Sequence, residues 1–304
     1  MKISDVKYLK KVCAVLRDKK QVASLSGLAE KLQEKGILWE AVGDAELSVA
    51  VMSREEANVR SAMAGKEAEN ADKGILYITD CKSVLEELIA LKLPVLACYH
   101  AGNRGEDLSE ARYAVEQPEE IEPAYLERVY RRVAGIPWDI LETERLRIRE
   151  SIPEDAEAFA RIYGESAITR FMESLADSKV SNPEYFRQYA RYVYEFYEFG
   201  IWTVIWKETG EVIGRVGFSM REAFEAPQLG YVIGTAWQGR GFAKEACEGV
   251  LRYAQEKLGF EQIQVLIQTH NIPSLNLACQ LGFVYERNLH IEEKEYQLLV
   301  KNYT

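Results

Sequence analysis

The chain has 304 residues, of which 47% are hydrophobic and 28% are charged, and its formal net charge is −10. This length and composition predict one large or two ordinary folded domains, and the acidic balance argues against a general nucleic-acid binder, which neutralises phosphates with Lys and Arg. No apolar run approaches the roughly 18 residues that span a bilayer, and the N-terminus mixes charged with apolar residues, so we expect a cytoplasmic protein without a membrane partner.

The first half of the chain reads as a small Rossmann-like α/β module over residues 1–136. Apolar residues recur at helical spacing between residues 5 and 35, which predicts two opening helices, on Val6, Leu9, Val12, Val15 and Leu16 and then on Leu25, Leu28 and Leu32. A short apolar run at 75–79, a helix at 82–92 and a second run at 94–99 predict a βαβ unit with parallel strands. A helix at 123–135 precedes Pro137, where the pattern changes and we expect a linker.

The second half, residues 141–304, has another rhythm. We expect a strand at 145–150, a helix at 153–164 and a long aromatic helix at 183–200. Two antiparallel strands then meet at Glu208-Thr209-Gly210. A strand at 227–234, a helix from Phe242 to Lys257, a strand at 261–269, a short helix at 273–282 and a last strand at 295–302 complete the reading.

The stretch TAWQGRGFAKEACEGV, residues 235–250, lies between the strand at 227–234 and the helix that follows it. Gly239 and Gly241 let the backbone bend tightly, the first helical turn offers N–H groups without internal partners, and Arg240 adds a positive charge. By its spacing alone this pattern fits equally an anion site and a turn that needs glycine only for its geometry. A P-loop is absent, and the dinucleotide fingerprint fails because Lys244 stands in place of its third glycine. Glu261, the acid at a suitable distance, starts the next strand instead of ending it.

A third kind of phosphate binder matches. The segment 228–283 resembles the acyl-CoA-binding core of the GNAT N-acetyltransferases, whose Q/R-x-x-G-x-G/A motif stands here as Gln238-Gly239-Arg240-Gly241-Phe242-Ala243. Residues 141–159 resemble the opening strand and helix of the ribosomal-protein N-acetyltransferase-like branch, and THNIPSLNLACQLGF resembles its N-x-x-S and L-G-F segment. The resemblance implies a mixed, mostly antiparallel central sheet flanked by helices over 141–304, with acetyl-CoA as the cosubstrate.

The resemblance also implies site residues. Backbone groups of Tyr231, Val232 and Ile233 are expected to bind the pantetheine arm, the motif residues the pyrophosphate, and Asn271 the coenzyme. Ser274 is the expected catalytic donor to the departing CoA thiolate, because Ala278 stands where many members of the family have a tyrosine. Alternatively, Ser274 caps the short helix.

The implied reaction is direct attack of an amine on the thioester, without a covalent enzyme intermediate. The general base is not identified by the sequence, and Glu222 and Glu225, before the strand at 227–234, are only candidates. The five cysteines are scattered without a C-x-x-C pair, so we expect reduced, mostly buried thiols and neither a disulfide framework nor a metal site. Cys247 and Cys279 fall within helical apolar patterns and are expected to pack instead of acting as nucleophiles.

The first half more loosely resembles the distal part of a haloacid dehalogenase-like Rossmannoid domain, with Asp80 where a metal-binding aspartate would lie. No D-x-D-x-T/V nucleophile motif occurs, and Asp80 is alternatively the N-cap of the helix at 82–92. The loop 99–107 follows a strand and is a candidate ligand loop. We expect a degenerate regulatory or interaction module.

Three hypotheses follow. The leading one is an acetyl-CoA-dependent N-acetyltransferase acting on a protein N-terminus, a peptide or a small amine. The second is a non-catalytic acyl-CoA sensor with the same fold, and the third is a phosphate-ester hydrolase centred on Asp80. We expect the aromatic residues of the helix at 183–200 mostly to pack in the core; the alternative is that those left over line an acceptor pocket or contact the first half.

Overall fold

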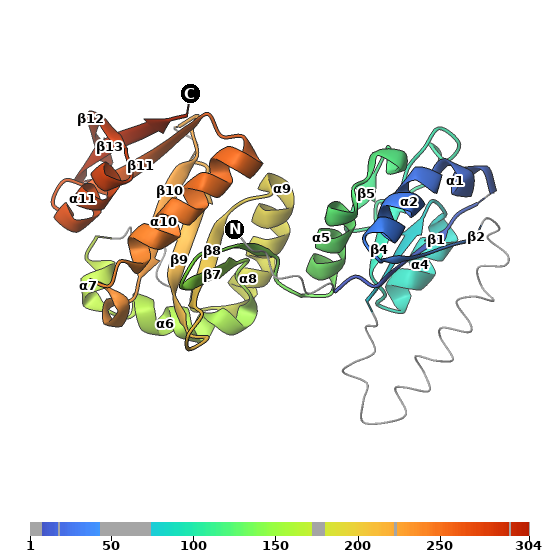
Figure 1. Cartoon of the computed structure of the whole chain (residues 1–304), viewed down its shortest axis with the longest axis horizontal. Helices are drawn as coiled ribbons and strands as arrows, with labels where there is room; N and C mark the ends of the chain where they lie inside the picture. The colour runs from blue at the N-terminus through green and yellow to red at the C-terminus, as the bar shows by residue number, and fades with distance from the viewer. Residues whose placement is uncertain are drawn as a thin grey trace. The chain divides into compact units, whose positions relative to one another are not determined.

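The computed structural model describes residues 8–17, 19–42, 74–171, 180–221, 224–291 and 293–303. The chain divides at Ile136 and Pro137 into two compact units, which are drawn in Figure 1. The N-terminal unit comprises Asp5–Ile136, and the C-terminal unit contains Pro137–Thr304. None of the helices in the described ranges is both long and apolar enough to cross a membrane.

The N-terminal unit is built on one parallel sheet with the strand order β2-β1-β3-β4-β5. Its strands are β1 (Lys11–Val15), β2 (Leu38–Val42), β3 (Ile75–Thr79), β4 (Val95–Cys98) and β5 (Ala114–Val115). The helices are α1 (Lys19–Ser24), α2 (Ser26–Glu34), α4 (Lys82–Ala90) and α5 (Pro123–Val133). Buried residues of α2 and α5 form one apolar cluster with the sheet, and those of α4 form a second. The unit is therefore a doubly wound α/β layer, as the sequence predicts.

The first of the two expected opening helices is wrong, because residues 11–15 form β1. Val12 and Ala14 belong to one apolar cluster, whereas Cys13 and Val15 belong to the other. A strand that is buried on both faces reads as a continuous apolar run, which spacing alone does not distinguish from a buried helix. The second expected helix is confirmed as α2, and the βαβ unit is confirmed as β3-α4-β4. Val6 lies outside the described residues.

The C-terminal unit is built on an eight-stranded sheet with the order β12-β13-β11-β10-β9-β8-β7-β6. Its strands are β6 (Asp139–Glu142), β7 (Leu146–Arg149), β8 (Ile201–Trp206), β9 (Val212–Ser219), β10 (Gln228–Ile233), β11 (Gln262–Gln268), β12 (Val284–Ile291) and β13 (Lys294–Asn302). The main helices are α6 (Ala156–Tyr163), α7 (Ser166–Thr169), α8 (Pro183–Tyr189), α10 (Phe242–Tyr253) and α11 (Ile272–Gln280). All neighbouring strands are antiparallel except β10 and β11.

The parallel strands β10 and β11 pair at a single position, Gln228 with Gln264. Beyond that pair the two strands separate, and Figure 1 shows β11, β13 and β12 turning away from β10. The separation leaves one edge of β10 without a partner strand. It lies beside the start of α10, whose inner face joins the main core through Phe242, Ala246, Cys247 and Val250.

The expected helix at 183–200 is confirmed as one unbroken helical run from Pro183 to Tyr197, with a π-helical segment inside it and an end three residues earlier than expected. It comprises α8, the π-helical segment at Ala190–Tyr194 and α9 (Glu195–Tyr197), and its C-cap is Glu198, whose φ is +60°. The π segment changes the helical register, so Phe186 and Tyr194 are buried whereas Tyr192 and Phe196 are exposed. The strand β6 begins two residues after Pro137, where the sequence suggested only a linker.

Candidate active site

A cavity of about 510 Å³ opens where β10 and β11 separate. Ten of the eleven residues expected to bind the coenzyme line it: Tyr231, Val232, Ile233, Gln238, Gly239, Gly241, Phe242, Ala243, Asn271 and Ser274. The residues that line the cavity thus come from β10, β11, α7, α10 and α11, among other elements. The fold brings together motifs that are up to 43 residues apart, from Tyr231 to Ser274.

The glycine loop has the backbone geometry that an anion cradle requires. Gly239 and Gly241 have φ values of +71° and +80°, in the left-handed region that residues with a β-carbon rarely adopt. Gly241 is the N-cap of α10, and the first helical hydrogen bond runs from the Glu245 N–H to the Gly241 carbonyl at 3.1 Å. The N–H groups of the residues between them therefore precede the helical ladder and are left for an anion at the mouth of the cavity.

Arg240 is the exception among the predicted coenzyme residues, because it is not among the residues that line the cavity. Its guanidinium lies over the ring of Trp206 at 4.6 Å and over that of Phe242 at 5.1 Å. The guanidinium of Arg145 also lies over the Phe242 ring, at 4.5 Å from its centre. Arg240 is thus placed to pack on the outside of the loop, and a direct charge contact would require its side chain to leave these rings.

A brace holds the start of α10, and the sequence analysis missed it. Glu245 accepts hydrogen bonds from the Arg145 backbone N–H at 2.8 Å, from the Arg145 Nε at 2.6 Å and from the Thr143 hydroxyl. Arg145 Nη1 also donates to the Arg240 carbonyl at 3.0 Å. Burial alone would raise the pKa of Glu245, but these hydrogen bonds and the Arg145 charge lower it below its ordinary value. The brace fixes the loop from the turn between β6 and β7, about a hundred residues earlier in the chain.

The unpaired edge of β10 meets the expectation for a pantetheine-binding strand in part. β10 pairs with β9 along its full length, and its other edge faces the cavity after Gln228. The Ile233 carbonyl, however, accepts a hydrogen bond of 2.8 Å from the Gln238 side chain. The Ile233 carbonyl, one of the backbone groups expected to contact the coenzyme, is therefore already bonded within the protein.

Asn271 and Ser274 stand at the start of α11. Asn271 is the N-cap, since its side chain accepts a hydrogen bond of 3.3 Å from the Ser274 backbone N–H. The alternative that Ser274 caps this helix is therefore wrong, and its hydroxyl is not used as a cap. Ser274 lines the cavity, as does Tyr231 from β10 on the facing wall.

The described residues that line the cavity include no carboxylate. Glu225 is exposed before β10 and is not part of the lining, and Glu222 lies outside the described residues. Gln228, at the point where β10 and β11 separate, has a buried side-chain oxygen without a hydrogen-bond partner among the described residues. An amide does not act as a general base, so the described lining offers hydrogen-bond acceptors but no carboxylate for proton removal.

The cysteines near the cavity differ from each other. Cys247 is fully buried, and burial raises the pKa of its thiol far above the ordinary range, so it stays protonated and packs in the core as expected. Cys279 is exposed on α11, so the expectation that it packs is wrong. Neither cysteine lines the cavity.

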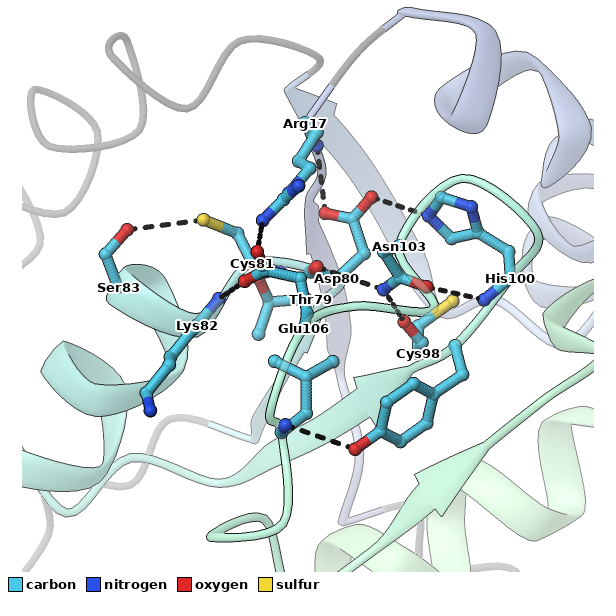
Figure 2. Close-up of polar contacts among 12 residues, drawn as sticks. Arg17, Thr79, Asp80, Cys81, Lys82, Ser83, Cys98, His100, Asn103 and Glu106 are labelled. Atoms are coloured by element: carbon cyan, nitrogen blue, oxygen red, sulfur yellow. Dashed lines mark hydrogen bonds and ion pairs between the residues drawn. The ribbon is translucent and has the colours of Figure 1, made fainter.

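The N-terminal unit contains a separate polar cluster, at the carboxyl ends of β1, β3 and β4 (Figure 2). Asp80 is completely buried, and its two carboxylate oxygens accept from the Arg17 backbone N–H and from His100 Nε2, both at 2.9 Å. His100 Nδ1 accepts from the Gly102 N–H at 3.0 Å, which leaves Nε2 as the donor to Asp80. The N-cap of α4 is Cys81 and not Asp80. The alternative reading of Asp80 as a helix cap is therefore wrong.

The remaining members of this cluster tie the same strand ends together. Asn103 Nδ2 donates to the Asp80 carbonyl at 3.0 Å and to the Cys98 carbonyl at 2.8 Å. Glu106 pairs with the Arg17 guanidinium and accepts from the Lys82 backbone N–H at 3.1 Å. The loop 99–107 thus folds back onto the sheet edge. Within the described ranges, no group of three or more His, Cys, Asp or Glu side chains is arranged to hold a metal ion.

The aromatic helix region does not contribute to the cavity. None of the described aromatic residues between Tyr185 and Phe199 lines it, and the wall on that side comes from Ala167, Ile168 and Phe171 in and after α7. The hydroxyls of Tyr189 and Tyr194 instead form hydrogen bonds with backbone groups. Tyr189 accepts from the Ile201 N–H, and Tyr194 donates to the Ile201 carbonyl and accepts from the Ser151 N–H. Trp237 and Lys244 line the cavity and were not predicted as site residues.

Comparison with known proteins places this geometry in a family. The model of the GNAT acetyltransferase domain matches residues 145–284. An uncharacterized N-acetyltransferase of Bacillus licheniformis is 30% identical over 166 residues, which is 54% of this chain and 93% of that protein. The ribosomal protein uS5-alanine N-acetyltransferase of Escherichia coli is 30% identical over 162 residues, which is 50% of this chain and 82% of the enzyme.

Solved structures also align with about half of the chain. The ribosomal-protein-S5-alanine acetyltransferase of Vibrio fischeri aligns with 53% of this chain and 95% of its own, at 21% identity and a TM-score of 0.46. The match to the domain model covers the glycine loop and most of the residues that line the cavity. The chain therefore belongs to the GNAT acetyltransferase family and is an acetyl-CoA-dependent N-acetyltransferase.

Proposed function

We propose that the C-terminal unit transfers the acetyl group of acetyl-CoA to the α-amino group of a peptide or protein whose first residue is small and uncharged. The observation that carries this proposal is the lining of the cavity: the described part has an apolar wall, from Ala167, Ile168 and Phe171, and includes no carboxylate. A polycationic amine would need carboxylates to replace its hydration, whereas the N-terminus of a small residue would not. The Escherichia coli relative, whose name specifies an alanine acceptor, supports the same class.

The reaction would be a direct attack in a ternary complex. The C–N bond forms as the neutral amine attacks the thioester carbonyl, and the amine gives its proton to water, since the described lining provides no carboxylate base. The C–S bond then breaks, and its electron pair leaves with the sulfur. In this proposal the glycine loop and the first turn of α10 hold the pyrophosphate, the free edge of β10 holds the pantetheine arm, and Asn271 and Ser274 bind near its end.

The experiment is thiol release from acetyl-CoA across a panel of acceptors. The panel contains peptides that begin with Ala or Ser, the same peptides with a blocked N-terminus, peptides that begin with Asp or Lys, and linear polyamines. We expect release with the free Ala and Ser peptides and none with their blocked forms. Faster release with polyamines than with any peptide would contradict the proposed acceptor class.

We also propose that the N-terminal unit is a regulatory or interaction module and not a phosphate-ester hydrolase. The support is the state of Asp80, which has no exposed surface and uses both carboxylate oxygens within the protein. Incubation of the full chain with p-nitrophenyl phosphate and Mg²⁺ is expected to release no more nitrophenol than the Asp80→Asn variant does. Release by the wild type that disappears in Asp80→Asn would contradict this reading.

A further inference from the structure

Two side chains with hydroxyl groups, from different elements, lie at the wall of the cavity. Tyr231 comes from β10 and Ser274 from α11, and both side chains line the cavity. The Tyr231 oxygen is itself buried and has no hydrogen-bond partner among the described residues. Burial raises the pKa of Tyr231 to about 12, and the nearby Ser274 hydroxyl counteracts part of that effect, although the two groups do not meet in hydrogen-bond geometry.

A buried hydroxyl without a partner is unfavourable, because its desolvation is not offset by a hydrogen bond. Ser274 offers the missing acceptor. Its backbone N–H is held by Asn271, which fixes the serine on the first turn of α11 while its hydroxyl remains free to rotate. Ser274 and Tyr231 are both partly exposed and line the cavity, whereas the Tyr231 oxygen is buried.

We propose that Tyr231 and Ser274 form a two-step donor chain, in which the sealed Tyr231 hydroxyl donates to Ser274 Oγ and thereby directs the Ser274 proton at the sulfur of CoA. The inference rests on the proposed function, since it requires the sulfur to lie in this cavity. Ser274 is the group that touches the reacting atom, and Tyr231 is a positioning residue that acts through it. Ala278, where a tyrosine would be expected from the family resemblance, leaves this role open for a tyrosine from another element.

The donor chain from Tyr231 to Ser274 stabilises the negative charge of the CoA thiolate without transferring a proton to it. When the C–S bond breaks, the electron pair stays on sulfur and the thiolate accepts a hydrogen bond from Ser274, whose oxygen accepts one from Tyr231. The thiolate takes its proton from water on release. A neutral phenol is suited to this role, because burial raises the pKa of Tyr231 to about 12 and the phenol therefore remains a donor at the lower pH values at which the amine loses its proton.

The test is the ionisation of the bound CoA thiol, which needs no acceptor. CoA is bound to the full chain, the ultraviolet absorbance of its thiolate is followed against pH, and the complex with desulfo-CoA is the blank. Wild type, Tyr231→Phe, Ser274→Ala and the double variant are compared. Lys244 and Tyr296 are the other titratable side chains in the described lining, and they are the same in all four proteins.

We expect the thiol pKa in the complex to be about one to two units higher in Ser274→Ala than in the wild type, a ten- to hundredfold change in the ionisation constant. Tyr231→Phe is expected to raise it by a smaller amount, and the double variant no further than Ser274→Ala, because Tyr231 acts through Ser274. An unchanged thiol pKa in Tyr231→Phe, or additive shifts in the double variant, would overturn the proposal.

Tyr303→Phe is the matched control. Burial raises the pKa of Tyr303 to about 12 as well, but its hydroxyl donates to the Leu251 carbonyl at 3.1 Å and does not line the cavity. Its removal is expected to leave the bound thiol unchanged. Should Tyr231→Phe fail to fold, Tyr231→3-fluorotyrosine is the second variant, because it keeps the hydroxyl and makes it a stronger donor. The pKa of the bound CoA thiol is then expected to fall. An unchanged value would refute the donor chain. Failure of the wild type to bind CoA would refute the proposed function instead.

Discussion

The glycine loop gives the sharpest test of the coenzyme site. Gly241 has a φ of +80°, and a β-carbon there would lie 3.4 Å from Arg145 Nη2. A β-branched residue in the left-handed region costs at least about 1–2 kcal/mol, so Gly241→Val forces either strain or a rotation of the loop. Rotation would turn the N–H groups at the start of α10 away from the pyrophosphate. We expect acetyl-CoA to bind about 10- to 100-fold more weakly, that is by about 1.4–2.8 kcal/mol.

Gly259 provides the matched control for Gly241. It follows the π-helical segment (Ala254–Leu258) that continues α10 and has a φ of +66°; apart from its chain neighbours, none of the described residues has an atom within 4 Å of the position of an added β-carbon. Gly259→Val therefore carries similar backbone strain without a place in the cavity. Calorimetry is expected to show weaker acetyl-CoA binding for Gly241→Val alone, with acetyl-pantetheine, which lacks the pyrophosphate, bound equally by all three proteins. Equal acetyl-CoA affinity in Gly241→Val and wild type would refute the assignment of the loop.

Three further predictions concern ionisation and the N-terminal unit. Because burial raises the pKa of Tyr231 to about 12 and the described lining has no carboxylate, kcat/KM is expected to rise with pH to a plateau whose midpoint follows the acceptor amine. A fall between about pH 7 and 10, or a midpoint that stays fixed for amines of different pKa, would contradict this. The pKa of Glu245 is lowered in the folded chain, so its brace stabilises above the ordinary Glu pKa of about 4.3 and is lost as pH falls through the folded value. Thermal melting should therefore show Glu245→Gln below wild type at neutral pH and equal to it in acid, and a gap that persists in acid would refute the reasoning. Asp80→Asn replaces one acceptor oxygen by a donor that faces either the Arg17 N–H or the His100 Nε2–H. We expect the free energy of unfolding of the N-terminal unit, measured in urea, to fall by about 1–3 kcal/mol. An unchanged free energy of unfolding would be inconsistent with the hydrogen bonds at Asp80.

The sequence predicted the parts of the site that lie close together along the chain. The glycine loop, the strand before it and the helix after it follow from local spacing, and the structure has them as β10 and α10. The βαβ unit was equally local. The parts that depend on partners far along the chain were missed: the brace between Arg145 and Glu245 joins residues a hundred positions apart, and no pattern in either segment indicates the other.

Two strands were not predicted, and the physical cause is related. A strand that is buried on both faces, or exposed on both, does not show the alternation of apolar and polar residues by which strands are recognised. The strand β1 is apolar throughout because both of its faces are covered, and it was read as a helix. The strand β12 was missed for the opposite reason, since almost all of its side chains are exposed at the edge of the sheet and VYERNLHI has no apolar alternation. The role of Asn271 as the cap of α11 instead of Ser274 depended on where the helix begins. Sequence patterns locate such boundaries least well.

The most direct test of the central claim joins both sides of the reaction. Acetyl-CoA and a peptide that begins with Ala are incubated with the full chain, and the released thiol and the N-terminally acetylated peptide are measured in the same sample. The proposed function predicts equal amounts of the two products, with the acetyl group on the α-nitrogen. Tight binding of acetyl-CoA without release, or release of thiol without acetylated peptide for every acceptor of the panel, would contradict it.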